Sequence, residues 1–109
     1  MRTGWAFWRA LGSPRYVAAP MVEQSELPFR MLVRELGAQL CYMPMLNARQ
    51  LDTVQQGGPY KELNFDPHSS DEPCFAQIAG NDPEMVLRSA RQLQHDIDAV
   101  DLNFGCSRP

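Results

Sequence analysis

The sequence predicts an α/β fold in which helices cover a parallel sheet. Four short stretches rich in apolar residues predict strands, and turn or helix-forming segments separate them. The order is strand, helix, strand, helix-like insert, strand, helix, strand, which is typical of repeated βα units and hence of a parallel sheet. The predicted strands are residues 16–19, 39–43, 73–78 and 97–103.

A helix is expected between the first two strands. Ser25 is expected to cap its start, and Gly37 lies where a glycine commonly ends a helix. Arg30 and Arg34 fall outside its apolar stripe, so we expect them on a solvated face rather than in a patch that binds RNA. The stripe, at helical spacing, consists of Phe29, Leu32, Val33 and Leu36.

The segment between the second and third strands, residues 46–72, is the least regular part of the chain. A helix is compatible with residues 47–56, and the two glycines and the proline at 57–59 are expected to break it. The third strand is followed by a clear helix start, with Asp82 as N-cap and Pro83 at the first helical position. The residues expected on the inner face of that helix are Val86, Ala90, Leu93 and Ile97.

Composition narrows the class of protein. A chain of 109 residues has the size of one small domain, and 44% hydrophobic with 21% charged residues is typical of globular proteins. The formal net charge of −3 argues against nucleic-acid binding through bulk charge. No apolar run approaches the roughly 20 residues of a membrane span, so we expect no membrane partner.

The three cysteines form no C-x-x-C pair, so the sequence signals neither a zinc site nor a redox pair, and we expect no metal. An odd number of cysteines without a signal peptide indicates a reducing compartment, and we expect the cytoplasm or the nucleus. The first 22 residues contain three arginines and no acidic residue, which leaves a mitochondrial transit peptide as the alternative.

The carboxyl ends of the predicted strands carry the candidate site. Parallel strands bring these ends to one edge of the sheet, where α/β proteins bind ligands. Gln77 and Asn103 are amides that offer a donor and an acceptor together, which suits the imide edge of a flat heterocycle, and methionines can pack against its ring. The alternatives are an amide that caps a neighbouring loop for Gln77, and core filling for the methionines. The four ends are Ala19-Pro20-Met21, Met43-Pro44-Met45, Gln77-Ile78-Ala79-Gly80 and Asn103-Phe104-Gly105-Cys106.

Cys106 is the candidate catalytic thiol, because it follows a turn glycine at a strand end. A purely structural role for it stays open. Cys41 and Cys74 are expected to be small buried core residues. Asp98 and Asp101 lie three residues apart on a strand and face opposite sides, so we expect hydrogen bonding at the strand end rather than a carboxylate pair.

The strand ends belong to a longer series of motifs that covers residues 16–106. The series is Ala19-Pro20-Met21-Val22, Ser25-Glu26-Leu27, Gly37-Ala38-Gln39-Leu40-Cys41-Tyr42, Pro44-Met45, Asn47-Ala48-Arg49, Gln77, Asn81-Asp82-Pro83 and Asp98-Ala99-Val100-Asp101-Leu102-Asn103 with Gly105-Cys106. It resembles the tRNA-dihydrouridine synthase family, most closely the eukaryotic-type group that acts on positions 16 and 17 of the tRNA D-loop.

The resemblance implies that residues 16–109 form the N-terminal half of a TIM (β/α)8 barrel, with about four parallel strands and intervening helices, that binds FMN. The family's RNA-binding domain is not among these residues. Residues 1–15 are expected to be an N-terminal extension. Open sheet edges make self-association an expectation. A short helix in the extension is expected to cover a barrel end through Trp5, Phe7, Trp8 and Leu11.

The resemblance also implies a reaction. In the family, NADPH reduces FMN, the flavin passes a hydride to C6 of a uridine in tRNA, and a cysteine protonates C5. Cys106 matches that general acid, Asn103 would hold the flavin or uracil edge, and Gln77 would bond the flavin imide. Pro20 and Met21 would line the flavin. The uridine must leave its stack to reach this site.

Two features depart from the family pattern. Ser107 stands where the family has a proline after its cysteine, and the family's later lysine, histidine and phosphate-binding loops are not among the 109 residues. We therefore expect that the isolated chain neither retains FMN nor reduces tRNA. Two alternatives stay open: another FMN-dependent barrel oxidoreductase of the dihydroorotate dehydrogenase type, and a non-catalytic truncated isoform or partial gene model.

Overall fold

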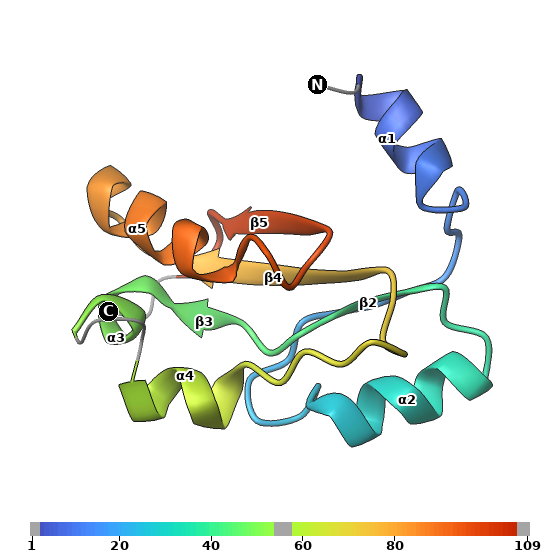
Figure 1. Ribbon diagram of the computed structural model, residues 1–109, viewed down its shortest axis with the longest axis horizontal. Helices are drawn as coiled ribbons and strands as arrows, with labels where there is room; N and C mark the ends of the chain where they lie inside the picture. The colour runs from blue at the N-terminus through green and yellow to red at the C-terminus, as the bar shows by residue number, and fades with distance from the viewer. Residues whose placement is uncertain (1–2, 54–57, 107–109) are drawn as a thin grey trace.

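The computed structural model describes residues 3–53 and 58–106, which form one parallel sheet with helices packed on it (Figure 1). This confirms the predicted α/β class. Residues 54–56 of the helix predicted over 47–56, and Ser107, lie outside the described residues. The helices are α1 Gly4–Ala10, α2 Leu27–Glu35, α3 Ala48–Asp52, α4 Gly58–Asn64 and α5 Pro83–Leu93, and the strands are β1 Val17–Ala18, β2 Leu40–Tyr42, β3 Leu46–Asn47, β4 Cys74–Ala79 and β5 Ala99–Asn103.

All strand pairs in the described sheet are parallel. β1 pairs with β2, both β2 and β3 pair with β4, and β5 pairs with β4. β1 and β5 thus pair with one neighbour each among the described residues, and the sheet is an open segment of a barrel rather than a closed one. The carboxyl ends of β3, β4 and β5 lie level with one another, because Asn47 and Asn103 both lie opposite Ala79.

β2 and β3 are two halves of one strand that is interrupted at Pro44. Tyr42 lies opposite Phe75 and Leu46 lies opposite Ile78, so a step of four residues faces a step of three in β4. The extra residue is a β-bulge, which a proline tolerates because it has no N–H to donate to the ladder. The prediction that the strand stops at Pro44 is therefore wrong in one respect, because pairing resumes two residues later.

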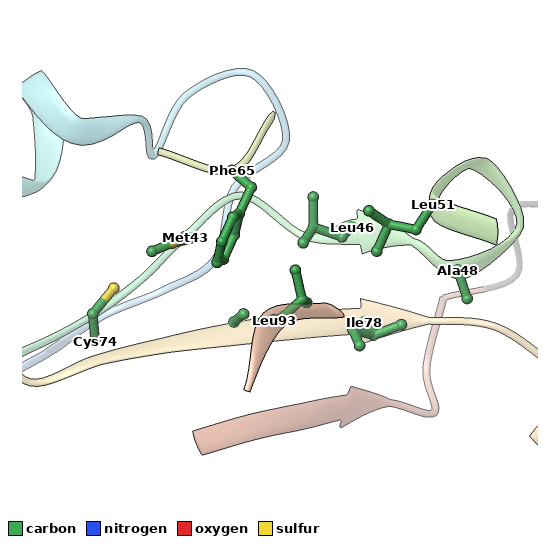
Figure 2. Packing of buried hydrophobic residues seen from close by; sticks show 9 residues of the cluster. Met43, Leu46, Ala48, Leu51, Phe65, Cys74, Ile78 and Leu93 are labelled. Atoms are coloured by element: carbon green, nitrogen blue, oxygen red, sulfur yellow. The ribbon is translucent and has the colours of Figure 1, made fainter. Parts of the chain in front are cut away.

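The hydrophobic core lies between one face of β4 and the helices α3 and α5 (Figure 2). Ala76 and Ile78 of β4 are fully buried there, as are Leu51 of α3 and Leu93 of α5. The turn after β4 needs Gly80, because an added Cβ would lie 2.9 Å from the Ala48 Cβ atom. The core residues are Met43, Leu46, Ala48, Leu51, Phe65, Cys74, Ala76, Ile78 and Leu93.

α5 follows the sequence prediction closely. The Asp82 side chain accepts hydrogen bonds from the backbone N–H groups of Glu84 and Met85, and Pro83 occupies the first turn. The helix ends at Leu93, before Ile97, which packs against the core from the following turn. The helix α4 was not predicted, because its first residues, Gly58 and Pro59, read as helix breakers, although proline is well tolerated in a first turn.

α2 is held to the rest of the molecule by ion pairs of Arg30 and Arg34 rather than by its predicted apolar stripe. The prediction that these two arginines lie on a solvated face is therefore wrong. The Arg30 side chain is fully buried, and Leu32 and Leu36 of the predicted stripe are 54% and 79% exposed. Arg30 Nε donates to Asp71 at 2.7 Å, and Arg34 Nε donates to the other carboxylate oxygen of Asp71 at 2.8 Å. Burial alone would lower the pKa of Arg30, but hydrogen bonds and charge from Asp71 and then Asp66 raise it above its ordinary value.

The start of α2 is also held by the loop that precedes β4. Glu26 is the N-cap residue and makes no capping hydrogen bond through its side chain, so the prediction of a Ser25 cap is wrong. The Leu27 N–H instead donates to Asp66 Oδ2 at 2.8 Å. Ser25, fully buried, closes the turn after β1, since its Oγ contacts both the N–H and the carbonyl of Met21. Gly37 ends the helix as predicted, with φ of +113°.

α1 projects away from the sheet in Figure 1 and contacts it through the Phe7 ring. Thr3 caps the helix, and the Phe7 ring stacks on Phe75 of β4 with 6.1 Å between centroids. Trp8 and Leu11 are half-buried, but Trp5 is 74% exposed, so its predicted covering role is wrong. None of the helices in the described part of the chain is long and apolar enough to cross a membrane.

Candidate functional site

The predicted site residues Gln77 and Asn103 lie together near the carboxyl ends of the neighbouring strands β4 and β5. In the parallel register, Gln77 lies opposite Asp101 and Ala79 opposite Asn103. Side chains two residues apart share a face of a strand, so Gln77, Asp101 and Asn103 all project from the face opposite the helix-covered core. The arrangement of β4 beside β5 is visible in Figure 1.

Asn103 connects this face to the loop that carries the thiol. Its Oδ1 atom accepts hydrogen bonds from the backbone N–H groups of Gly105 at 2.8 Å and Cys106 at 3.0 Å. Its Nδ2 atom donates to Gln77 Oε1 at 3.3 Å and to the sulfur of Met45 at 3.2 Å. Asn103 thus makes four contacts within the chain, which equals the capacity of a primary amide.

Gln77 makes two hydrogen bonds with described residues and has further hydrogen-bonding capacity. Its Nε2 atom donates to Asp101 Oδ2 at 2.6 Å, and its Oε1 atom accepts from Asn103. A primary amide has two N–H groups and two acceptor positions, so within residues 3–53 and 58–106 Gln77 retains one of each. That pair of groups matches the requirement for holding the imide edge of a heterocycle.

The three thiols differ in environment as the sequence predicts. Cys41 and Cys74 are buried in the core, whereas Cys106 is half-exposed at the end of β5. Burial raises the pKa of Cys41, with a smaller contribution from the Asp71 charge. Burial and then the charge of Asp71 raise the pKa of Cys74 to about 12. Both core thiols therefore stay protonated, and Cys106 is the accessible one.

Pro20 and Met21 lie just past the end of β1, separated from β4 by β2. Both are half-buried, and the Met21 N–H is occupied by the Ser25 hydroxyl at 2.9 Å. They share the carboxyl edge of the sheet with the Gln77 and Asn103 pair, but within the described residues no hydrogen bond joins them to it. Their predicted role, lining a flavin, stays a prediction.

Aromatic rings cover the same face of the sheet on the amino-terminal side of Gln77 and Asp101. Tyr42 of β2 packs edge-on against Phe75 with 5.4 Å between centroids, and Phe7 stacks on the same ring. Burial raises the pKa of Tyr42, and the negative charge of Asp101 raises it further. The polar network thus has an apolar layer on its amino-terminal side, and strengthened hydrogen bonds follow from the lower local dielectric.

A groove lies at the opposite edge of the sheet, before β4 and β5. It is a polar groove with a volume of about 410 Å³. Cys106 is not among its lining residues. The described residues contain no group of three or more His, Cys, Asp or Glu side chains that could hold a metal ion. The groove lining is Pro67, His68, Ser69, Asp71, Glu72, His95, Asp96, Ile97 and Asp98.

Asp101 belongs to the site although the sequence did not assign it to the site, and Met45, which the sequence placed at this edge, contacts Asn103 through its sulfur. The sequence predicted Asp98 and Asp101 as hydrogen bonders, and both are: Asp98 accepts from the Cys74 N–H at 2.9 Å and Asp101 accepts from Gln77. The signal for Asp101 was its position two residues before Asn103, on the same face of a strand. Finding its partner required the register of β4 against β5.

Comparison with known proteins places this arrangement in a family. Residues 17–109 match the dihydrouridine synthase (Dus) family. The chain is 49% identical over 105 residues to a tRNA-dihydrouridine(16/17) synthase [NAD(P)(+)]-like protein of Rattus norvegicus, covering 94% of this chain and 24% of that protein. It is 43% identical to the Saccharomyces cerevisiae tRNA-dihydrouridine(16/17) synthase [NAD(P)(+)], covering 95% and 25%. Identity to tRNA-dihydrouridine synthase B of Xanthomonas campestris is 31%, covering 86% and 28%. The chain therefore spans about a quarter of the length of these relatives.

Proposed function

The chain belongs to the dihydrouridine synthase family, and we propose that it forms the first part of the catalytic barrel of an enzyme that reduces uridine in tRNA to 5,6-dihydrouridine. The observation that carries the proposal is the position of Cys106. This thiol is half-exposed at the carboxyl end of β5, and its backbone is tied through Asn103 to Gln77 on β4. The carboxyl edge of parallel strands is where barrel enzymes place their reacting groups.

In this proposal Cys106 is the general acid. Reduction of the uracil 5,6 double bond needs a hydride at C6 and a proton at C5. FMN, reduced by NADPH, supplies the hydride when it is bound. The Cys106 S–H bond breaks as the new C5–H bond forms, and the resulting thiolate regains its proton from solvent. A target uridine must be extruded from the tRNA to bring C5 to the thiol.

The polar residues of the edge fit a flavin ring in part. Gln77 retains one donor and one acceptor after its bonds to Asp101 and Asn103, which is the pair that an isoalloxazine imide requires. We propose that Gln77 holds the imide and that Pro20 and Met21 line the ring. Asn103 accepts from the loop through Oδ1 and donates to Gln77 and Met45 through Nδ2, so its contribution is to hold Cys106 in place next to the ring and the uracil edge.

The family match favours this reaction over the dihydroorotate dehydrogenase type of flavin barrel that the sequence left open. The substrate named for the relatives is tRNA, and for this chain tRNA remains part of the proposal. The formal net charge of −3 is no obstacle, because the chain spans only about a quarter of each relative, and RNA contacts can lie in the remainder.

A chimeric enzyme tests the proposal. The matching quarter of the Rattus norvegicus relative is replaced by this chain, and dihydrouridine is measured in tRNA that lacks the modification. The chimera is expected to form dihydrouridine, and Cys106→Ala is expected to slow the reaction about 10²- to 10⁴-fold, as for loss of a general acid. Cys41→Ala serves as the matched thiol control. A Cys106→Ala chimera as fast as the unsubstituted chimera would refute the role of Cys106.

A further inference from the structure

We propose that Asp101 is a positioning residue that sets the donor and acceptor direction of the side-chain network leading to Cys106. The inference rests on the proposed function only for the meaning of Cys106 in catalysis. The structural part stands on four hydrogen bonds that run from Asp101 through Gln77 and Asn103 to the backbone of the loop.

The first step is the contact between Asp101 and Gln77. A carboxylate accepts hydrogen bonds and donates none, whereas a primary amide can present either its NH2 group or its oxygen. Because Asp101 lies directly opposite Gln77 in the register, the Gln77 amide must turn its NH2 group toward Asp101. The resulting bond, Nε2 to Oδ2, measures 2.6 Å, as expected for a short bond to a charged acceptor.

In the second step, the orientation of the Gln77 amide determines which group it presents to Asn103. With its NH2 group turned to Asp101, Gln77 presents Oε1 to Asn103. An oxygen cannot donate, so Asn103 must turn its own NH2 group toward Gln77, at 3.3 Å. The Met45 sulfur, a weak acceptor 3.2 Å from the same nitrogen, favours the same orientation of the Asn103 amide.

The third step reaches the loop. With its nitrogen turned inward, Asn103 presents Oδ1 to the segment that follows β5. That oxygen accepts from the N–H groups of Gly105 and Cys106, and this closes a turn of the kind that Asn side chains form with backbone two and three residues onward. If the Asn103 amide were reversed, an NH2 group would face two N–H groups, and the turn would open.

Asp101 therefore acts on Cys106 from a distance, by fixing the orientation of the Gln77 amide and, through it, stabilising the orientation of Asn103 that closes the loop. It touches neither the thiol nor the loop. Three acceptor oxygens alternate with their donors along the network without a mismatch. Asp101, which can only accept, fixes the direction at one end, and the backbone N–H groups of Gly105 and Cys106, which can only donate, favour the same direction at the other. Removing the Asp101 carboxylate is expected to loosen the Cys106 loop while leaving strand pairing intact.

A pair of substitutions tests the acceptor. Asp101→Asn and Asp101→Leu both remove the charge, but only the asparagine side chain keeps an oxygen that can face Gln77. Hydrogen exchange of the Cys106 amide is followed by NMR on the 109-residue chain. We expect about fivefold faster exchange for Asp101→Leu, the factor for loss of one net hydrogen bond, and less than a twofold change for Asp101→Asn. Equal rates in the two variants would overturn the proposal.

A swap of donor and acceptor supplies the second measurement. Gln77→Glu places a carboxylate against Asp101 and is expected to speed Cys106 amide exchange and alkylation of its thiol. Adding Asp101→Asn returns a donor to the contact and is expected to restore both rates. Asp96→Asn, which removes a charge from an exposed residue of the preceding turn, should not restore them in Gln77→Glu. Restoration by Asp96→Asn, or none by Asp101→Asn, would overturn the proposal.

These readouts are independent of tRNA reduction. If the exchange rates follow the expected pattern but the Cys106→Ala chimera stays fully active, the network orders the loop and the proposed role of Cys106 is wrong. If the chimera depends on Cys106 but the Asp101 variants leave exchange unchanged, the proposed function stands and the positioning role of Asp101 falls.

Discussion

Arg30 provides the sharpest test of how this chain is held together. Its side chain and that of Asp71 are both 0% exposed and joined by a bond of 2.7 Å, and Arg30 also donates to Asp66 and to the Ser25 carbonyl. Arg30→Met removes the cation and leaves a buried carboxylate with Arg34 as its remaining partner in this cluster. Breaking one side of a buried pair costs about 3–5 kcal/mol, against a total of roughly 5–15 kcal/mol for a typical domain.

Urea unfolding followed by far-ultraviolet circular dichroism measures this loss. Arg91→Met, an exposed arginine on α5, is the matched control and is expected to change the free energy of unfolding by less than about 0.5 kcal/mol. The double variant Arg30→Met/Asp71→Leu is expected to recover part of the loss, because the fully buried carboxylate is removed together with its buried cation. An Arg30→Met chain that unfolds at the same urea concentration as the unsubstituted chain would refute the reasoning.

Four further outcomes are expected. Native alkylation at pH 8 should modify Cys106 and spare Cys41 and Cys74, as mass spectrometry of the labelled peptides would show. Burial raises the pKa of Cys74 to about 12, so above pH 9 the thiol ionises in the unfolded chain but not in the folded one. The unfolded state then binds fewer protons, and the free energy of unfolding should fall by about 1.4 kcal/mol per pH unit between pH 9 and 12, a slope that Cys74→Ala should reduce in urea titrations. Gly80→Ala should lower the free energy of unfolding by about 1–3 kcal/mol, because its Cβ would lie 2.9 Å from the Ala48 Cβ, whereas Gly4→Ala meets open space and should not. The isolated chain mixed with FMN and desalted should carry no visible flavin absorption, and a retained band would contradict that expectation.

The strands and their direction were predictable because they depend on local composition. Short apolar runs separated by helical segments predict parallel βα units, and the described sheet confirms that prediction. The start of α5 was predictable for the same reason, since Asp82 and Pro83 act within one turn of the helix. Gly37 likewise ends α2 as expected.

The packing of α2 was not predictable, because it depends on residues far apart in the sequence. Periodicity placed Phe29, Leu32, Val33 and Leu36 on an inner face, and charge placed Arg30 outside. The partners of Arg30 lie 36 and 41 residues further on, in a segment that reads as a loop. A helix assigned from its own sequence alone is oriented by its apolar residues, and a buried carboxylate in a distant loop can override that preference.

In the candidate site, the types of side chain could be predicted from the sequence, but their hydrogen-bond partners could not. Gln77 and Asn103 were predicted as ligand-holding residues because each amide carries a donor and an acceptor, and that property also lets them bond to each other. Which role prevails depends on the register of β4 against β5, which sets Asp101 opposite Gln77. The number of hydrogen bonds differs between the two amides: Asn103 uses all its capacity, whereas Gln77 keeps a donor and an acceptor that no described residue occupies. Gln77 is therefore the stronger candidate for contact with a bound heterocycle, and Asn103 is the residue that holds the thiol loop in place for it.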